Sequence, residues 1–152
     1  MKKIIKVSAI KDGTVIDHIP SGRAMEIINY LKLKSKDNDN SIVVGVNFSS
    51  SKMTKKDVIK IENKELTSIE LDQISVFAPK ATITIIRDFD KVKKYKLKTP
   101  EFFIDIIICP NPKCITNYEK METKFVNIHV NPLRVKCFYC EKIFNEKEIT
   151  LK

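Results

Sequence analysis

The sequence predicts an α+β fold in two parts, and three observations support this. An antiparallel ferredoxin-like sheet with two helices is expected over residues 1–98, and a small all-β domain that binds zinc over residues 99–152. First, elements over roughly the first 90 residues alternate in the order of a split βαβ unit. Second, a strongly basic stretch then interrupts the apolar pattern. Third, all four cysteines follow that stretch.

The chain begins with two short β-branched runs and then a helical one. Lys3–Ile10 and Thr14–Ile19 flank an Asp12-Gly13 pair, which is a strong hairpin signal. Ser21 precedes a segment in which apolar residues recur at helical spacing, namely Ala24, Ile27, Ile28 and Leu31. The sequence therefore predicts a hairpin followed by a helix.

Two further strands are expected after a polar stretch at 34–40. Ser41–Phe48 is rich in β-branched residues, and Lys56–Glu62 alternates cleanly. In the second run, Asp57, Ile59 and Ile61 share one face, whereas Lys56, Val58 and Lys60 share the other. One face of this strand is thus largely apolar and the other largely basic.

A second helix and a last strand complete the first part. Thr67 and Glu70 have the spacing of a capping box, and Leu71, Ile74 and Ala78 follow at helical spacing. Pro79 ends that helix, and Ala81–Ile86 reads as a strand. Apart from the opening hairpin, the order is strand, helix, strand, strand, helix, strand, so both helices should cover one sheet face and leave the other free for a ligand or partner.

The segment Arg87–Lys98 carries many cations and little apolar periodicity, so we expect a basic connector there. The roughly 50 residues beyond it are too few to fold reliably around a hydrophobic core alone. A domain of that size needs an additional constraint, such as a metal ion or disulfides.

The cysteines supply that constraint. Cys109 and Cys114 enclose four residues, Cys137 and Cys140 enclose two, and 22 residues separate the pairs. Two such pairs can close a tetrahedral four-thiolate site, for which Zn²⁺ is the expected ion and rubredoxin-like iron an alternative. Because four protein ligands leave no open position, one zinc per chain would be structural.

Composition limits the function classes. The chain has 152 residues, a net charge of +9, a pI of about 9.3 and 43% hydrophobic residues, as in a soluble globular protein. The charge favours an anionic partner, but by itself it is explained better by lysines on a solvated surface. No apolar run approaches the roughly 20 residues that span a bilayer. Polar residues such as Lys6, Ser8 and Lys11 interrupt any signal-peptide core near the N-terminus, so we expect a cytoplasmic protein. Thiols stay reduced in that compartment, which favours a metal over disulfides at the four cysteines. With two histidines, three glycines and no recognisable catalytic motif, a free-standing enzyme is not expected.

Five segments together resemble the regulatory chain of aspartate carbamoyltransferase: Gly13–Pro20, Lys56–Asn63, Phe77–Thr82, Cys109–Ile115 and Lys136–Lys142. The resemblance implies a non-catalytic subunit of pyrimidine biosynthesis, with an allosteric domain at 1–98 and a zinc domain at 99–152 that docks on the catalytic chain. It implies homodimers of regulatory chains that bridge catalytic trimers, and CTP or ATP as ligands. It gives no role to a membrane or to nucleic acid.

The same resemblance assigns a nucleotide site. Lys94 and His18 would serve the phosphates, and Asp17 and Lys60 would lie near the ribose and base with Lys56 beside them. Backbone groups of Ala9 and Ile10 would read the base, and Val15 would pack on it. Thr84, Phe89 and Lys91 depart from the Asn, Tyr and Val frequent in the family, which leaves the base preference open.

A zinc-ribbon nucleic-acid-binding protein is the alternative, since the net charge and the four cysteines both permit it. Against it, the basic cluster lies in the expected connector, and the zinc domain mixes glutamates with its lysines. These are Glu119, Glu122, Glu141, Glu146 and Glu148.

Overall fold

The computed structural model describes residues 9–31 and 39–152, which form two compact units. The first unit comprises the chain up to Leu71 together with Lys80–Leu97, and the second comprises Asp72–Pro79 together with Lys98–Lys152. The expected strand at Lys3–Ile10 falls largely outside the described residues, and Ala9 and Ile10 carry no strand. Across the described ranges, no helix is long and apolar enough to cross a membrane.

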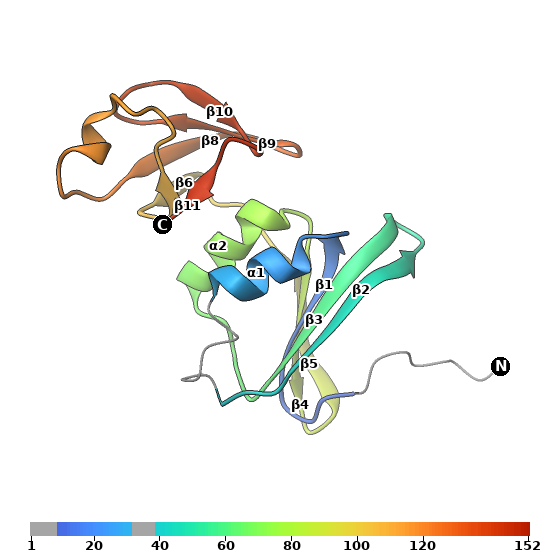
Figure 1. The fold of residues 1–152 in the computed structure, drawn as a ribbon. Coiled ribbons are helices and arrows are strands. Elements are labelled where there is room, and N and C mark those ends of the chain that lie inside the picture. Colours follow the sequence, from blue (N-terminus) through green and yellow to red (C-terminus); the bar gives the residue numbers. More distant parts are fainter. Residues whose placement is uncertain (1–8, 32–38) are drawn as a thin grey trace. The chain divides into compact units, whose positions relative to one another are not determined.

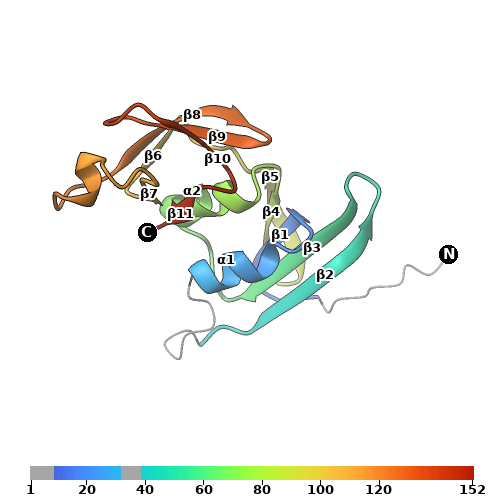
Figure 2. The same ribbon diagram turned by 45° about the horizontal axis from the view of Figure 1, so that its top comes forward.

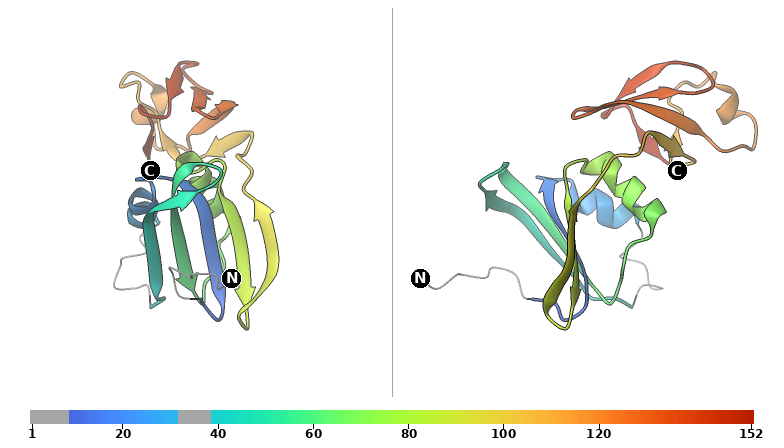
Figure 3. Two further views of the ribbon diagram at one scale, coloured as in Figure 1. Left: turned by 90° about the vertical axis from the view of Figure 1, so that its right-hand side faces the viewer. Right: turned by 180° about the vertical axis from the view of Figure 1, so that it is seen from behind.

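The first unit is built on an antiparallel five-stranded sheet in the order β2-β3-β1-β4-β5. Its strands are β1 (Gly13–Pro20), β2 (Ile42–Ser50), β3 (Thr54–Glu62), β4 (Thr82–Arg87) and β5 (Asp90–Lys96). They lie side by side in that order in Figure 3, and β2 and β3 form the long hairpin of Figure 2. The ferredoxin-like order predicted from the sequence is therefore confirmed, with β5 added at one edge.

Helix α1 (Ala24–Tyr30) lies against one face of this sheet (Figure 1). Alternation along the strands decides which side chains turn to that face. Ile16 on β1, Ile59 on β3 and Ile83 on β4 are at most 1% exposed, and the helix buries Ala24, Ile27 and Ile28. Burying an aliphatic side chain of this size contributes about 1.5–3 kcal/mol. The opposite face carries the alternate residues of the same strands.

Asp57 joins three elements at the start of α1. It is fully buried, and its Oδ2 accepts hydrogen bonds from the backbone N–H groups of Gly22 (2.9 Å) and Ala24 (3.2 Å). Its Oδ1 accepts from the N–H of Asn47 on β2 (3.0 Å). A buried carboxylate on the apolar face of β3 is thus satisfied by backbone donors from the β1–α1 connection and from β2.

Helix α2 (Ser68–Phe77) begins with the predicted capping box. The Thr67 N–H donates to Glu70 Oε2 (3.1 Å), and the Glu70 N–H donates to Thr67 Oγ1 (3.2 Å). These reciprocal bonds satisfy backbone donors that the first turn leaves without a helical partner. The helix ends before Pro79, as the sequence predicts.

The expected connector at Arg87–Lys98 is wrong, because Asp90–Lys96 forms the edge strand β5, paired with β4. Six of its seven residues are exposed, so neither face shows the apolar alternation by which strands are recognised. Lysines along an edge strand also discourage pairing with other chains.

The second unit is all-β apart from the 3₁₀ turn η1 (Ile115–Asn117) and the helical residues 72–77. Its four-stranded sheet has the order β10-β9-β8-β6, and a two-stranded sheet pairs β11 with β7. The strands are β6 (Phe102–Ile104), β7 (Ile107–Ile108), β8 (Lys124–Val130), β9 (Leu133–Cys137), β10 (Ile143–Asn145) and β11 (Thr150–Leu151). Phe103, Phe125 and Leu133 are fully buried in its core.

Candidate functional site

A pocket of about 310 Å³ opens on the sheet face opposite α1. Apolar side chains of Ile10, Val15, Val58 and Ile86 form part of its lining, and Asp17 and three lysines add charge. The residues that line it are Ala9, Ile10, Val15, Asp17, Val58, Lys60, Thr82, Thr84, Ile86, Phe89, Lys91 and Lys94. The sequence analysis had left this face free for a ligand.

Antiparallel register explains why these residues meet. Val15 of β1 lies opposite Lys60 on one side and Thr84 on the other, and Thr84 in turn lies opposite Lys94. Directly opposed residues in antiparallel strands point to the same face. Lys60 and Lys94 therefore stand at the two ends of one row, three strand spacings or about 14 Å apart at the backbone. Both lysine side chains line the pocket together with the apolar side chains of Val15 and Val58.

Asp17 and His18 sit in a bulge of β1. The register with β3 shifts between Ile16 and Ile19, and His18 adopts a left-handed φ of 59°. Its backbone N–H donates to Asp17 Oδ1 (2.6 Å), and its ring Nδ1 lies 2.9 Å from Thr82 Oγ1. Bulges re-aim side chains next to binding sites. Here the bulge sets an imidazole beside the pocket wall.

Lys56 holds the Asp17 carboxylate from the neighbouring strand. Its Nζ lies 2.9 Å from Oδ1 and 3.0 Å from Oδ2. Burial opposes ionisation of Asp17, but the hydrogen bond from Lys56, the His18 N–H and the positive charge outweigh it, so the pKa falls below 3.8. Asp17 is therefore a carboxylate at neutral pH, and it offsets one of the surrounding cations.

The charge around His18 is strongly positive. Burial is the main reason that the His18 pKa lies below its ordinary value of 6.5, and the ammonium groups of Lys56, Lys52 and Lys94 lower it further. The Asp17 carboxylate opposes them without reversing the shift. Burial also lowers the pKa of Lys60 from 10.5. The pocket thus offers several cations in a partly desolvated setting, which suits a multiply charged anion.

Six of the eight residues expected at the nucleotide site line this pocket: Ala9, Ile10, Val15, Asp17, Lys60 and Lys94. The other two lie one contact away, since Lys56 pairs with Asp17 and His18 bonds to Thr82. Val58, Thr82 and Ile86 were not anticipated as lining residues. Alternation could have found Val58, because it lies between Lys56 and Lys60 on the basic face of its strand.

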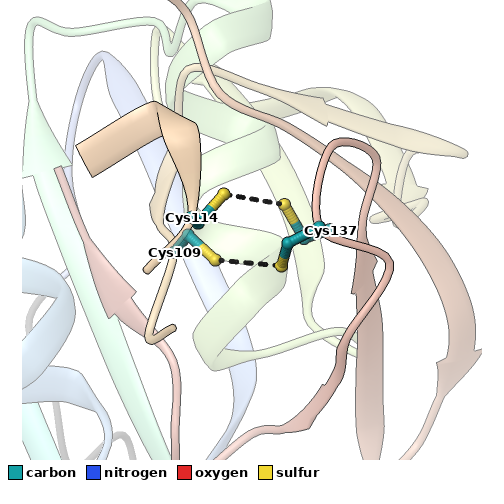
Figure 4. Close-up of side chains that lie close together, drawn as sticks. Cys109, Cys114 and Cys137 are labelled. Carbon is teal, nitrogen blue, oxygen red and sulfur yellow. Dashed lines mark hydrogen bonds between the residues drawn. The ribbon is translucent and has the colours of Figure 1, made fainter. Parts of the chain in front are cut away.

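The four cysteines of the second unit converge from two loops (Figure 4). Their sulfurs all lie within 4.8 Å of one another, with Cys109 to Cys140 at 3.7 Å and Cys114 to Cys137 at 3.8 Å. A disulfide needs about 2.05 Å. A tetrahedron of thiolates at about 2.3 Å from a central ion has edges of about 3.8 Å. The separations therefore fit a metal ion and exclude disulfides.

Neighbouring groups shape the first cysteine loop. Asn117 Nδ2 donates to the carbonyls of Cys109 (3.0 Å) and Asn111 (2.7 Å), and Thr116 Oγ1 donates to Cys114 Sγ (3.2 Å). Burial raises the pKa of the Cys109 thiol far above its usual range, so a cation is needed to keep it ionised. At the more exposed Cys140, burial is outweighed by hydrogen bonds, and the pKa falls to about 7.

Comparisons with known proteins assign both parts of the chain to one family. A family model described as "Aspartate carbamoyltransferase regulatory chain, allosteric domain" matches residues 5–98, and one described as the metal binding domain of the same chain matches residues 102–150. The chain belongs to the family of aspartate carbamoyltransferase regulatory chains. It is therefore a non-catalytic subunit.

Curated regulatory chains are similar over nearly their whole length. The one from Pyrococcus horikoshii is 47% identical over 145 residues, which is 95% of each chain. The one from Thermoplasma volcanium is 46% identical over 149 residues, 97% of each chain. The one from Sulfolobus acidocaldarius is 45% identical over 150 residues, 97% of this chain and 90% of that protein.

Proposed function

We propose that this regulatory chain binds a nucleoside triphosphate, CTP or ATP, in the pocket of the first unit and thereby changes the activity of the catalytic chains. The pocket carries this proposal, because it combines an apolar floor with Lys60 and Lys94 at opposite ends of one row. Phosphates need compensating cations, and lysines provide them without a glycine-rich loop.

The roles proposed for the individual residues are those that the family resemblance implies. Lys94 and His18 contact the phosphates, near Lys56. Asp17 and Lys60 lie toward the ribose and base. The backbone of Ala9 and Ile10 reads the base, and Val15 packs on it. The regulatory effect is the difference in nucleotide affinity between two states of the assembly, typically worth about 1–3 kcal/mol.

We further propose that the four cysteines hold one structural Zn²⁺ per chain. Zinc accepts tetrahedral thiolate coordination, and all four positions are filled by protein, so no water is activated. The ion would stabilise the second unit, because its binding free energy is also folding free energy. Iron in the same ligands would absorb visible light, so elemental analysis with an absorption spectrum separates the two metals.

The second unit would then dock on a catalytic chain, while regulatory chains pair and bridge catalytic trimers. We place this assembly in the cytoplasm, where the four thiols stay reduced. Light scattering after size-exclusion chromatography tests assembly, on the chain mixed with catalytic trimers, with and without zinc. A large zinc-dependent complex is expected, and Cys137→Ser should prevent it by unfolding the second unit. A folded, zinc-loaded chain that forms no complex would favour the nucleic-acid-binding alternative.

Titration calorimetry of the full chain tests the nucleotide site. Lys94→Ala should weaken CTP and ATP binding about tenfold, the loss expected for one charge-assisted hydrogen bond. Lys93→Ala is the matched control, because Lys93 lies opposite Ile85 on the other face of the same strand. Equal affinities in wild type, Lys94→Ala and Lys60→Ala would refute the site while leaving the family assignment intact.

A further inference from the structure

The turn between β4 and β5 presents an exposed aromatic ring at the rim of the pocket. Asp88 (φ 50°) and Phe89 (φ 67°) form its two-residue loop, and both are left-handed. Hairpin loops of this kind favour Asn and Gly, and a bulky residue there is strained by about 1–3 kcal/mol. Phe89 is nevertheless 62% exposed and lines the pocket. A strained, exposed ring at a pocket indicates contact with a ligand.

The turn is tied to the chain segment that lines the same pocket. The Asp88 N–H donates to Asp12 Oδ1 (3.0 Å), and the Phe89 N–H donates to the Lys11 carbonyl (2.9 Å). These bonds connect the turn to the residues directly after Ala9 and Ile10. The ring and the lining backbone therefore form one anchored end of the pocket.

A bulge in β5 adds a cation to that end. Ile85 lies opposite Lys93, but the next residue, Ile86, lies opposite Lys91, so Val92 has no partner in the register. In a regular strand Lys91 and Lys94, three positions apart, would point to opposite faces. The unpaired Val92 restores Lys91 to the pocket side, and both lysines line the pocket.

Along the strands, Lys91 lies at the opposite end of the pocket from His18, with Lys94 between them. Along β1, Gly13 lies opposite Ile86, the partner of Lys91, whereas Asp17 lies opposite Thr82, the partner of the His18 ring. Four residues of a strand span about 13 Å. With the phosphates at the His18 end, Lys91 lies beside the base, together with Phe89.

We propose that Lys91 reads the base and selects carbonyl-bearing bases over adenine, with Phe89 as the stacking surface; this rests on the proposed binding of nucleoside triphosphates. An ammonium group has three donors and no acceptor. Uracil, cytosine and guanine carry a carbonyl oxygen that accepts strongly from it, whereas adenine has no carbonyl and offers only ring nitrogens as acceptors, beside an exocyclic amine that does not accept. The triphosphates of UTP, CTP and ATP carry the same charge, so their attraction to Lys91 cancels in the ratio of affinities.

Calorimetric titration of the full chain with UTP, CTP and ATP tests the proposal on Lys91→Val. Lys93→Val is the matched control, since it removes the same charge from the opposite face of β5, where the Lys93 ammonium lies 5.2 Å from the Tyr95 ring centre. Lys91→Val should weaken UTP and CTP binding about five- to tenfold and ATP binding less than twofold. Lys93→Val should leave all three affinities within twofold.

Three results would overturn the proposal, and only the last of them would also overturn the proposed function. An equal loss for all three nucleotides, or no loss for any, would show that Lys91 does not read the base, while binding by the wild type would still support the proposed function. A wild-type chain that binds none of the three nucleotides would remove both.

Discussion

Replacing Asp57 with Ala should strongly destabilise the first unit, because one buried carboxylate accepts three backbone hydrogen bonds. The Ala24 N–H is buried, and losing its acceptor costs about 1–3 kcal/mol. Gly22 and Asn47 are exposed, so water can replace the carboxylate at a net cost of about 0.5–1.5 kcal/mol each. The sum is about 2–6 kcal/mol, a large part of a typical domain stability of about 5–15 kcal/mol.

Native-state hydrogen exchange measures this loss in the first unit alone. The slowest amides of β1, β3 and β4 report its opening free energy independently of the metal-bound unit. The stability of Asp57→Asn should lie between those of the wild type and Asp57→Ala. Its one amide oxygen can still accept from the backbone donors on one side, whereas its NH₂ group faces a donor on the other. Asp90→Ala, an exposed carboxylate on β5, is the control and should change stability by less than about 0.5 kcal/mol. If Asp57→Ala also lowered the stability of the first unit by less than about 0.5 kcal/mol, that result would refute the argument.

Three further predictions concern the pocket and the metal centre. A bound polyphosphate should raise the lowered pKa of His18, so affinity should increase as the pH falls towards the pKa of the free imidazole. Calorimetry on His18→Asn should show that dependence lost. Phe89→Gly should relieve backbone strain and stabilise the first unit by about 1 kcal/mol, yet weaken nucleotide binding. Thermal melts measure the stability and titrations measure the affinity, and a variant in which both rise or both fall would contradict this. Thr116→Val removes the hydroxyl that donates to Cys114 Sγ, so a chelator assay should show metal loss accelerated about tenfold, whereas unchanged release would assign that hydroxyl no role.

Features set by a few adjacent residues were predictable from the sequence. The capping box of α2 needs only Thr67 and Glu70, and both predicted hydrogen bonds are present. The cysteine pairs likewise form from short loops, and their sulfurs reach metal-binding separations. Alternation placed Lys56, Val58 and Lys60 on one face of β3 because that strand is regular between Lys56 and Glu62 and one face is buried.

Features that depend on distant partners were not predictable. Alternation placed Asp57 on the buried face, but its backbone donors come from residues 10 to 35 positions away. Strand β5 was interpreted as a connector, since an edge strand of exposed lysines carries no burial pattern. The contribution of Val58, Thr82 and Ile86 to the pocket depends on the order of the strands in the sheet, which no single segment specifies.

The two bulges show why site residues are harder to predict than the fold. Strand order and hydrophobic alternation tolerate one extra residue, because β1 and β5 still pair with their neighbours on both sides of the shift. The face of every side chain beyond a bulge, however, changes. Without the unpaired Val92, a regular β5 that keeps Lys94 opposite Thr84 would turn Lys91 away from the pocket. The set of side chains that line the pocket is therefore decided by irregularities that leave the topology of the sheet unchanged.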